Sequence, residues 1–166
     1  MSMLFMTNDE FSVKEMNGNK YLCCDVQGFF LCLLYSTECQ YCDEMIQIFK
    51  RLPGSIGGCQ FGVINVSKNK QLIIDSMKTE NQIKYVPMTI LFHNGIPRVL
   101  YKGPRNIQDI QQFVVEVAEK LSKENFSNKK SEEDIKKTFY ENCVNVDNYL
   151  CDGDVCYFKD IYQTKN

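Results

Sequence analysis

An uninterrupted apolar stretch that ends at a pair of cysteines constrains this chain most. Residues Phe29 to Tyr35 read FFLCLLY, and Cys39 and Cys42 follow after a short polar break. A continuous apolar run of this length predicts a strand covered on both faces. Apolar residues then recur at helical spacing from Met45 to Leu52, which predicts a helix that opens at the cysteines. A buried strand therefore delivers two cysteines to a helix N-terminus.

This position gives the two cysteines a chemical meaning. Unpaired backbone N–H groups and the positive end of the helix dipole stabilise a thiolate, which is the nucleophilic form of cysteine. We therefore predict that Cys39 is a nucleophile. Cys42 lies one helical turn further on and on the same face, so we predict that it attacks a mixed disulfide formed at Cys39. Because nine cysteines in 166 residues make a chance C-x-x-C pair common, this prediction depends on the strand and helix around the pair.

Composition and charge exclude several classes of function. The chain is 44% apolar, which is enough to build the core of one ordinary domain with an appendage. Its formal net charge of −2 shows no basic excess, so neither a nucleic acid nor an anionic membrane is an expected partner. No apolar run is long enough to span a membrane, and Met1 to Phe11 has no signal-peptide features. The expected compartment is the reducing cytosol, where an odd number of cysteines indicates buried thiols plus a catalytic pair.

The predicted elements alternate along the chain around the cysteine pair. Strand, helix, strand and helix follow one another, and two further strands joined by a tight turn precede a long amphipathic helix. This order predicts an α/β fold with a mixed sheet. The elements are a hairpin around Asn17-Gly18, the strand Phe29–Tyr35, the helix to Leu52, the strand Phe61–Val66, the helix Asn69–Asn81, the strands Met88–His93 and Arg98–Tyr101 around Asn94-Gly95, and a helix capped by Asn106 with its apolar stripe ending at Leu121.

The C-terminal part reads as an extension of a domain that covers residues 1–122. Residues 123–166 read as a linker, a short helix from Ser131 and a tail that contains Cys143, Cys151 and Cys156. These cysteines are compatible with unreactive thiols, a thiol relay to the active pair, a disulfide such as Cys151–Cys156, or a three-thiolate metal site. The tail aromatics predict packing against this domain or a partner chain, and they are Tyr140, Tyr149, Tyr157, Phe158 and Tyr162.

With its elements in this order, the chain resembles the thioredoxin family over roughly residues 20–122. The resemblance rests on the strand Phe29–Tyr35, the pair Cys39-Gln40-Tyr41-Cys42, Val86-Pro87 before the strand Met88–Phe92, the turn Asn94-Gly95, and Gly103 before the last helix. It implies a three-layer sandwich, with a central mixed sheet flanked by helices and a cis peptide bond at Val86-Pro87 beside the cysteines. In the family, the backbone before this proline pairs with an extended substrate segment. The resemblance therefore implies that Val86, Pro87 and Tyr41 bind substrate.

The motif also departs from the family pattern. The position where thioredoxins carry a buried acid falls on Leu33, so deprotonation of the second cysteine must rely on water or another group. The Gly-Gly and acidic pattern with which glutaredoxins bind glutathione is absent, and we predict no glutathione binding. Three acidic neighbours, Glu38, Asp43 and Glu44, oppose thiolate formation. We therefore expect the reduction potential of the Cys39/Cys42 couple to lie near the reducing end of the family's range.

Two functions of different classes follow. The first is a thiol–disulfide oxidoreductase that acts on protein disulfides, needs no bound cofactor and exchanges electrons with a donor or acceptor protein. The second is a redox-inert thioredoxin-fold module whose tail mediates assembly, for instance in a virion. Large DNA viruses encode thioredoxin-like proteins of this sort, and the abundance of lysine and asparagine is compatible with that source. A zinc site at the pair is not predicted, because there is one C-x-x-C and the single histidine, His93, falls in a strand.

Overall fold

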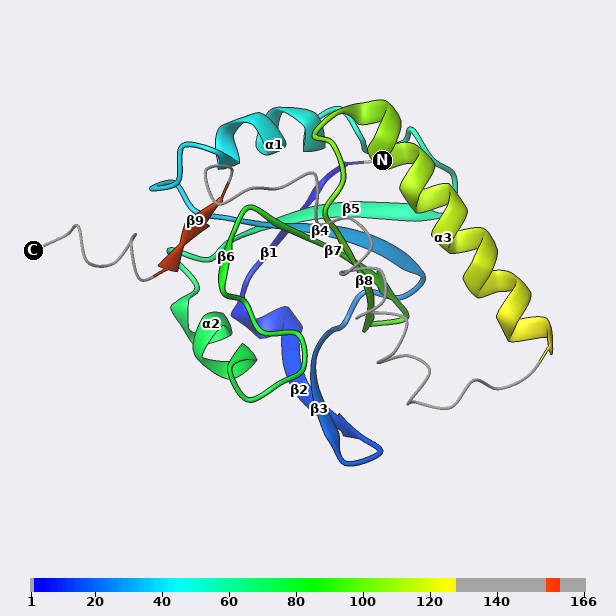
Figure 1. Cartoon of the computed structure of the whole chain (residues 1–166), viewed down its shortest axis with the longest axis horizontal. Helices are drawn as coiled ribbons and strands as arrows, with labels where there is room; N and C mark the ends of the chain where they lie inside the picture. The colour runs from blue at the N-terminus through cyan, green and yellow to red at the C-terminus, as the bar shows by residue number, and fades with distance from the viewer. Residues whose placement is uncertain (1, 128–154, 159–166) are drawn as a thin grey trace, which may run out of the picture.

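A mixed sheet of five strands forms the centre of the computed structural model, which describes residues 2–127 and 155–158. The strand order is β1-β5-β4-β7-β8 (Figure 1). The neighbours β1, β5 and β4 are parallel, β7 is antiparallel to β4, and β8 is antiparallel to β7. The strands are β1 (Leu4–Met6), β5 (Cys59–Asn65), β4 (Phe29–Tyr35), β7 (Met88–His93) and β8 (Ile96–Tyr101). The predicted mixed α/β sheet is confirmed, with β4 buried between two neighbours.

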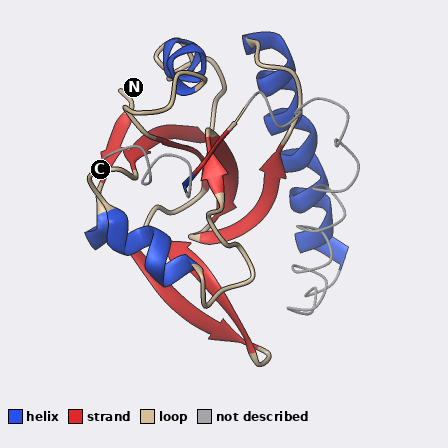
Figure 2. Cartoon of the chain, turned by 60° about the vertical axis from the view of Figure 1, so that its left-hand side comes forward, coloured by secondary structure: helices blue, strands red, loops and turns tan. Residues whose placement is uncertain are grey.

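Helices and a hairpin cover the two faces of this sheet. Side chains alternate along β4, and Leu31 and Leu33 pack into one buried cluster with residues of α1 and α3, whereas Cys32 packs into another with residues of α2 and the hairpin. Figures 1 and 2 show these layers around the sheet. The helices are α1 (Cys42–Phe49), α2 (Lys70–Ser76) and α3 (Ile107–Ser127). The three-layer arrangement is the thioredoxin-like architecture that the resemblance implied.

The N-terminal region contains the predicted hairpin. Strands β2 (Phe11–Met16) and β3 (Asn19–Cys24) pair antiparallel across a turn in which Asn17 and Gly18 have positive φ angles of 51° and 78°. The 3-10 helix η1 (Asn8–Glu10) precedes the hairpin and starts with a capping box at Thr7.

The buried side chain of Asn81 joins the hairpin to the segment after α2. Its Oδ1 accepts a hydrogen bond from the Leu22 N–H at 2.7 Å, and its Nδ2 donates to the Leu22 carbonyl at 2.9 Å. Both backbone groups of this buried residue are thereby satisfied away from water. The bonds connect the hairpin to the layer that contains α2.

The last helix begins as predicted but ends later. Asn106 caps it, with Oδ1 accepting a hydrogen bond from the Asp109 N–H at 2.8 Å. The helix continues to Ser127, so residues 123–127 of the predicted linker are helical. Charged and polar residues such as Lys and Glu are good helix formers on an exposed face, and their polarity does not end a helix. The short helix predicted from Ser131 lies outside the described residues, and the division at residue 122 stays a prediction.

A second small sheet lies at the end of β4 that leads into α1. Strand β6 (Tyr85–Val86) pairs antiparallel with β9 (Cys156–Tyr157) from the C-terminal region. Figure 1 shows β9 beside β6 and next to the loop that enters α1. Within the described part of the chain, no helix is long and apolar enough to cross a membrane.

Candidate thiol–disulfide site

The loop between β4 and α1 positions the first cysteine. Ser36 is buried directly after β4, and its hydroxyl oxygen accepts a hydrogen bond from the Glu38 N–H at 3.1 Å. The Ser36 carbonyl accepts one from the Cys39 N–H at 3.3 Å, and the Cys39 carbonyl accepts one from the Cys42 N–H at 3.2 Å. These successive turns place Cys39 just before α1 and make Cys42 its first residue. The predicted placement of both cysteines at a helix N-terminus is confirmed.

Cys39 forms a disulfide with a cysteine of the C-terminal region. Its partner is Cys156, which lies 117 residues further along the chain, and the two Cα atoms are 5.8 Å apart. Cys39 is almost fully buried, and its Sγ lies 3.5 Å from the Val86 carbonyl oxygen. The alternative pairing Cys151–Cys156 is therefore wrong, because Cys156 is bonded elsewhere. Cys143 and Cys151 lie outside the described residues.

The strand that contains Cys156 pairs with the residues before Pro87. In the β6–β9 ladder, Val86 lies opposite Cys156 and Tyr85 lies opposite Tyr157. The rings of these two tyrosines meet edge to face, with centroids 5.9 Å apart. The Val86-Pro87 peptide bond is cis. The structure thus brings Cys39, Val86 and Pro87 together around a segment of the chain itself.

Cys42 is the buried partner of the predicted pair. Its thiol is free and inaccessible to solvent, and burial raises its pKa to about 11. A hydrogen bond from the backbone of Ser36 and the positive charge of Arg105 act in the opposite direction, and the charge of Asp43 adds to the increase. Cys42 therefore holds its proton at neutral pH.

Arg105 is a site residue that the sequence reasoning missed. It lies between the breaker Gly103-Pro104 and the cap of α3, and its charge lowers the Cys42 pKa against the effect of burial. The only sequence signal was a single cation in the loop before a long helix. Leu33, at the position of the family's buried acid, is fully buried and lies opposite Thr89 in the sheet. Among the described residues, Arg105 is the only charged group that favours the Cys42 thiolate.

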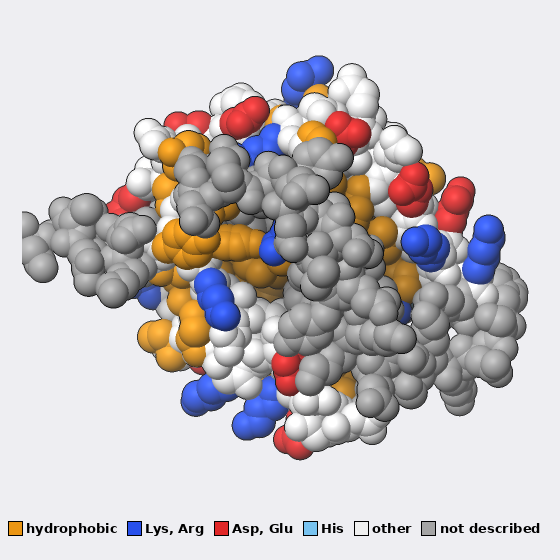
Figure 3. All heavy atoms as spheres, viewed as in Figure 1, with side chains coloured by type: hydrophobic (Ala, Val, Ile, Leu, Met, Phe, Trp, Pro, Cys, Tyr) orange, Lys and Arg blue, Asp and Glu red, His pale blue; other side chains and the backbone are white. Residues whose placement is uncertain are grey.

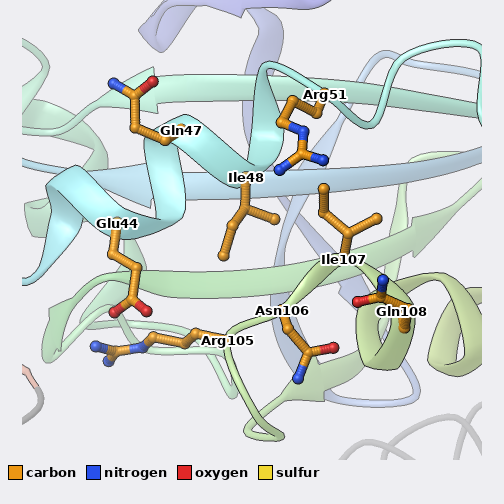
Figure 4. A pocket seen from close by; sticks show the side chains of 8 residues that line it. All are labelled: Glu44, Gln47, Ile48, Arg51, Arg105, Asn106, Ile107 and Gln108. Carbon is orange, nitrogen blue, oxygen red and sulfur yellow. The ribbon is translucent and has the colours of Figure 1, made fainter.

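Arg105 also lies at one end of a surface groove of about 480 Å³ between α1 and the start of α3. Figure 4 shows its guanidinium group and the Glu44 carboxylate pointing toward one another, with Ile48 and Ile107 further along. Neither cysteine of the pair lines this groove. The groove is therefore separate from the disulfide.

Tyr41, the third predicted substrate residue, is half-buried immediately before α1. It packs against the buried cluster that includes Cys39 and Cys42, and Cys156 packs against the same cluster. The structure thus brings Tyr41 near the disulfide, and its contact with a substrate stays a prediction.

The other described cysteines are buried free thiols outside the disulfide. Burial raises the pKa of each of them; they are Cys23, Cys24, Cys32 and Cys59. Cys23 and Cys24 are adjacent in β3, and both are free thiols. Within residues 2–127 and 155–158, no three His, Cys, Asp or Glu side chains cluster as a metal site would require.

His93 lies at the end of β7, as predicted. Its ring stacks on Phe29 with centroids 4.3 Å apart. Burial and the nearby charge of Arg98 lower its pKa, so the imidazole is neutral at physiological pH. The residue is part of the packing at the strand end.

Two curated proteins of iridescent viruses are similar to this chain, and no protein-family model matches it. "Uncharacterized protein 196R" of Invertebrate iridescent virus 6 is 38% identical over 91 residues, which are 55% of this chain and 52% of that protein. "Uncharacterized protein 020R" of Invertebrate iridescent virus 3 is 22% identical over 118 residues, which are 69% and 71% of the two chains. The chain therefore spans about half the length of the first of these relatives.

Solved structures include folds similar to that of this chain. The zinc-bound form of human ERp44 superposes with a TM-score of 0.50 and 11% identity, over 70% of this chain and 30% of that one. A thioredoxin of Malassezia sympodialis superposes with a TM-score of 0.45 and 15% identity, over 57% of this chain and 80% of that one. The fold is thioredoxin-like.

Proposed function

We propose that the chain is a thiol–disulfide oxidoreductase acting on protein disulfides through Cys39 and Cys42. The observation that carries the proposal is the disulfide from Cys39 to a cysteine in a strand that pairs with Val86. A mixed disulfide with an extended substrate segment requires the same arrangement, with main-chain pairing beside the nucleophile. The tail of the chain supplies an example of that arrangement.

The reaction balances without a bound cofactor. The Cys39 thiolate attacks one sulfur of a substrate disulfide, which forms a mixed disulfide and releases the other substrate cysteine as a thiolate. Cys42, once deprotonated, attacks the Cys39 sulfur and releases the second substrate thiol. The substrate is then reduced by two electrons, and Cys39 and Cys42 are joined by a disulfide. A donor protein with a dithiol restores the pair.

The proposed roles depend on the environment of each sulfur. Cys39 precedes a helix N-terminus, where free N–H groups favour a thiolate. Cys42 is buried with a raised pKa, so it attacks only in the fraction of molecules that have lost its proton. Val86 supplies the backbone that aligns the substrate segment, with Pro87 and Tyr41 beside it.

Insulin reduction by dithiothreitol tests the proposal, because dithiothreitol also opens the Cys39–Cys156 disulfide. We expect Cys39→Ser to lose the catalysed rate and Cys42→Ser to accumulate mixed disulfides. The matched control is Cys59→Ala, which removes a buried thiol at the start of β5 and should retain activity. Equal rates for the wild type and Cys39→Ser would refute the oxidoreductase function.

A second candidate function is a redox-inert structural module. The observation that favours it is the same disulfide, which ties the C-terminal region to the domain and consumes the thiol of Cys39. In that case the link would persist as a structural disulfide, and the insulin assay would show no dependence on Cys39. Cytoplasmic synthesis and packaging in a virion stay predictions, which the iridescent-virus relatives support.

A further inference from the structure

The segment Val155–Phe158, here called the tail segment, occupies the position that the proposed function gives to a substrate. Its cysteine is bonded to Cys39, and its backbone pairs with β6. Val155 and Phe158 on either side of the ladder are buried, with 7% and 8% of their surfaces exposed. Tyr157 is 40% exposed and rests its ring against Tyr85. The segment therefore has two buried apolar positions and one exposed aromatic position around its bonded cysteine.

Backbone pairing and side-chain burial contribute differently to which segments the site binds. Main-chain hydrogen bonds to β6 hold any extended segment, whereas buried side chains distinguish one sequence from another. Phe158 belongs to the same buried cluster as Cys39 and Val86, so it fills space inside the domain. Figure 3 shows apolar side chains gathered over the region where Figure 1 places β6 and β9. A polar residue in place of Phe158 would leave apolar surface exposed to water.

We propose that the tail segment is an internal substrate and that its sequence states what the site accepts. This inference rests on the proposed oxidoreductase function. The accepted partner is an extended protein segment with an apolar residue before its reactive cysteine, an aromatic residue after it and a large apolar residue next. The apolar positions correspond to Val155 and Phe158, and the aromatic position corresponds to Tyr157.

The tail leaves the site by an exchange that needs no external oxidant. The Cys42 thiolate attacks the Cys39 sulfur, the Cys39–Cys156 bond breaks, and a Cys39–Cys42 bond forms. Cys156 departs as a thiolate and takes a proton from water. One disulfide is conserved throughout, and β6 becomes free to pair with a partner segment.

Two matched peptides test the substrate class. The first is DVCYFK, which copies the sequence around Cys156, and the second is DSCYSK, with serine in place of both buried apolar residues. Each peptide carries its cysteine as a mixed disulfide with 5-thio-2-nitrobenzoate, a good leaving group. The protein is the reduced full-length chain with Cys156→Ser, whose tail cannot bond to Cys39. Because the comparison changes only the peptide, the same protein serves in both arms.

The measured quantity is the rate of thionitrobenzoate release, with the rate of the Cys39→Ser, Cys156→Ser chain subtracted. We expect DVCYFK to react at least about tenfold faster than DSCYSK, a difference of about 1.4 kcal/mol. Adding Phe158→Ser to the protein should raise the DVCYFK rate, because the tail segment then competes less well for the site beside β6.

The possible failures are distinguishable. Equal rates for the two peptides that both require Cys39 would overturn the substrate class and leave the oxidoreductase function standing. An unchanged DVCYFK rate after Phe158→Ser would overturn the claim that the tail segment and the substrate share the site beside β6. Release that does not depend on Cys39 at all would refute the proposed function itself.

Discussion

The pH dependence of tail release gives a quantitative test of Cys42. In the state in which Cys39 is bonded to Cys156, burial raises the Cys42 pKa to about 11. Only the thiolate attacks, so its rate should rise about tenfold for each pH unit below that pKa. At pH 7 about one Cys42 in ten thousand is ionised, and at pH 9 about one in a hundred. An ordinary thiol with a pKa of about 8.5 would instead approach a constant rate above about pH 9.

Alkylation of the released thiol provides the assay. Oxidised full-length protein is incubated with excess iodoacetamide, and carbamidomethylated Cys156 is quantified by peptide mass spectrometry. When the rate no longer depends on iodoacetamide concentration, it reports the attack of Cys42. We expect a continuous increase of about tenfold per unit between about pH 7 and about pH 10. The Cys42→Ser variant is the control and should release no Cys156.

Two results would refute this reasoning. A release rate that becomes constant above about pH 9 would show that the Cys42 thiol is hydrated and that its pKa is close to the ordinary value. Equal release in the Cys42→Ser variant would show that Cys156 leaves by a route that does not use Cys42.

Three further predictions follow from buried groups. Arg105→Gln should slow Cys156 release at pH 8 by about two- to tenfold, because the charge that lowers the Cys42 pKa is lost. Arg51→Gln, which changes another cation of the surface groove, is the control, and equal release rates for the two variants would exclude the effect of Arg105. Asn81→Ala should lower the free energy of urea unfolding by about 2–5 kcal/mol, because both Leu22 backbone groups lose their partner; a change below about 0.5 kcal/mol would contradict this. Three buried thiols have a folded-state pKa near 11, so above about pH 9 they ionise only in the unfolded chain. The free energy of unfolding should therefore fall by about 1.4 kcal/mol per pH unit for each thiol. A constant free energy of unfolding from about pH 9 to about pH 10 would contradict this. These thiols belong to Cys24, Cys42 and Cys59.

Local patterns were sufficient to predict most of the sheet. The run Phe29–Tyr35 is a strand over the predicted residues, because a central strand excludes polar side chains on both faces. The hairpins at Asn17-Gly18 and Asn94-Gly95 formed where two residues with positive φ are needed. Strand β1 was missed, since three residues with an exposed Phe5 carry no period that a sequence can show.

The composition of the site depended on contacts that no local pattern contains. Cys39 and Cys156 are 117 residues apart, and the sequence left four alternatives open for the tail cysteines. The acidic neighbours Asp43 and Glu44 were visible beside the pair, but Arg105 was not, because it is brought close only by the fold. Sequence reasoning therefore placed the pair at a helix N-terminus and missed the cation that lowers the Cys42 pKa.

The burial of Cys42 also bears on how long the tail segment remains bonded. At neutral pH a pKa of about 11 leaves several hundred times less thiolate than a pKa of about 8.5 would. A thiolate of higher pKa is intrinsically more nucleophilic. With a Brønsted coefficient of about 0.45, this difference in pKa makes each Cys42 thiolate about ten times more reactive. Cys42 should then attack the Cys39–Cys156 bond about thirty times more slowly than a thiol with a pKa of about 8.5 would. An external thiolate is not subject to this burial, and Cys156 is more exposed than Cys39. We therefore expect the burial of Cys42 to favour a long-lived tail-bonded state, which a thiol from outside the chain should open faster than Cys42 does.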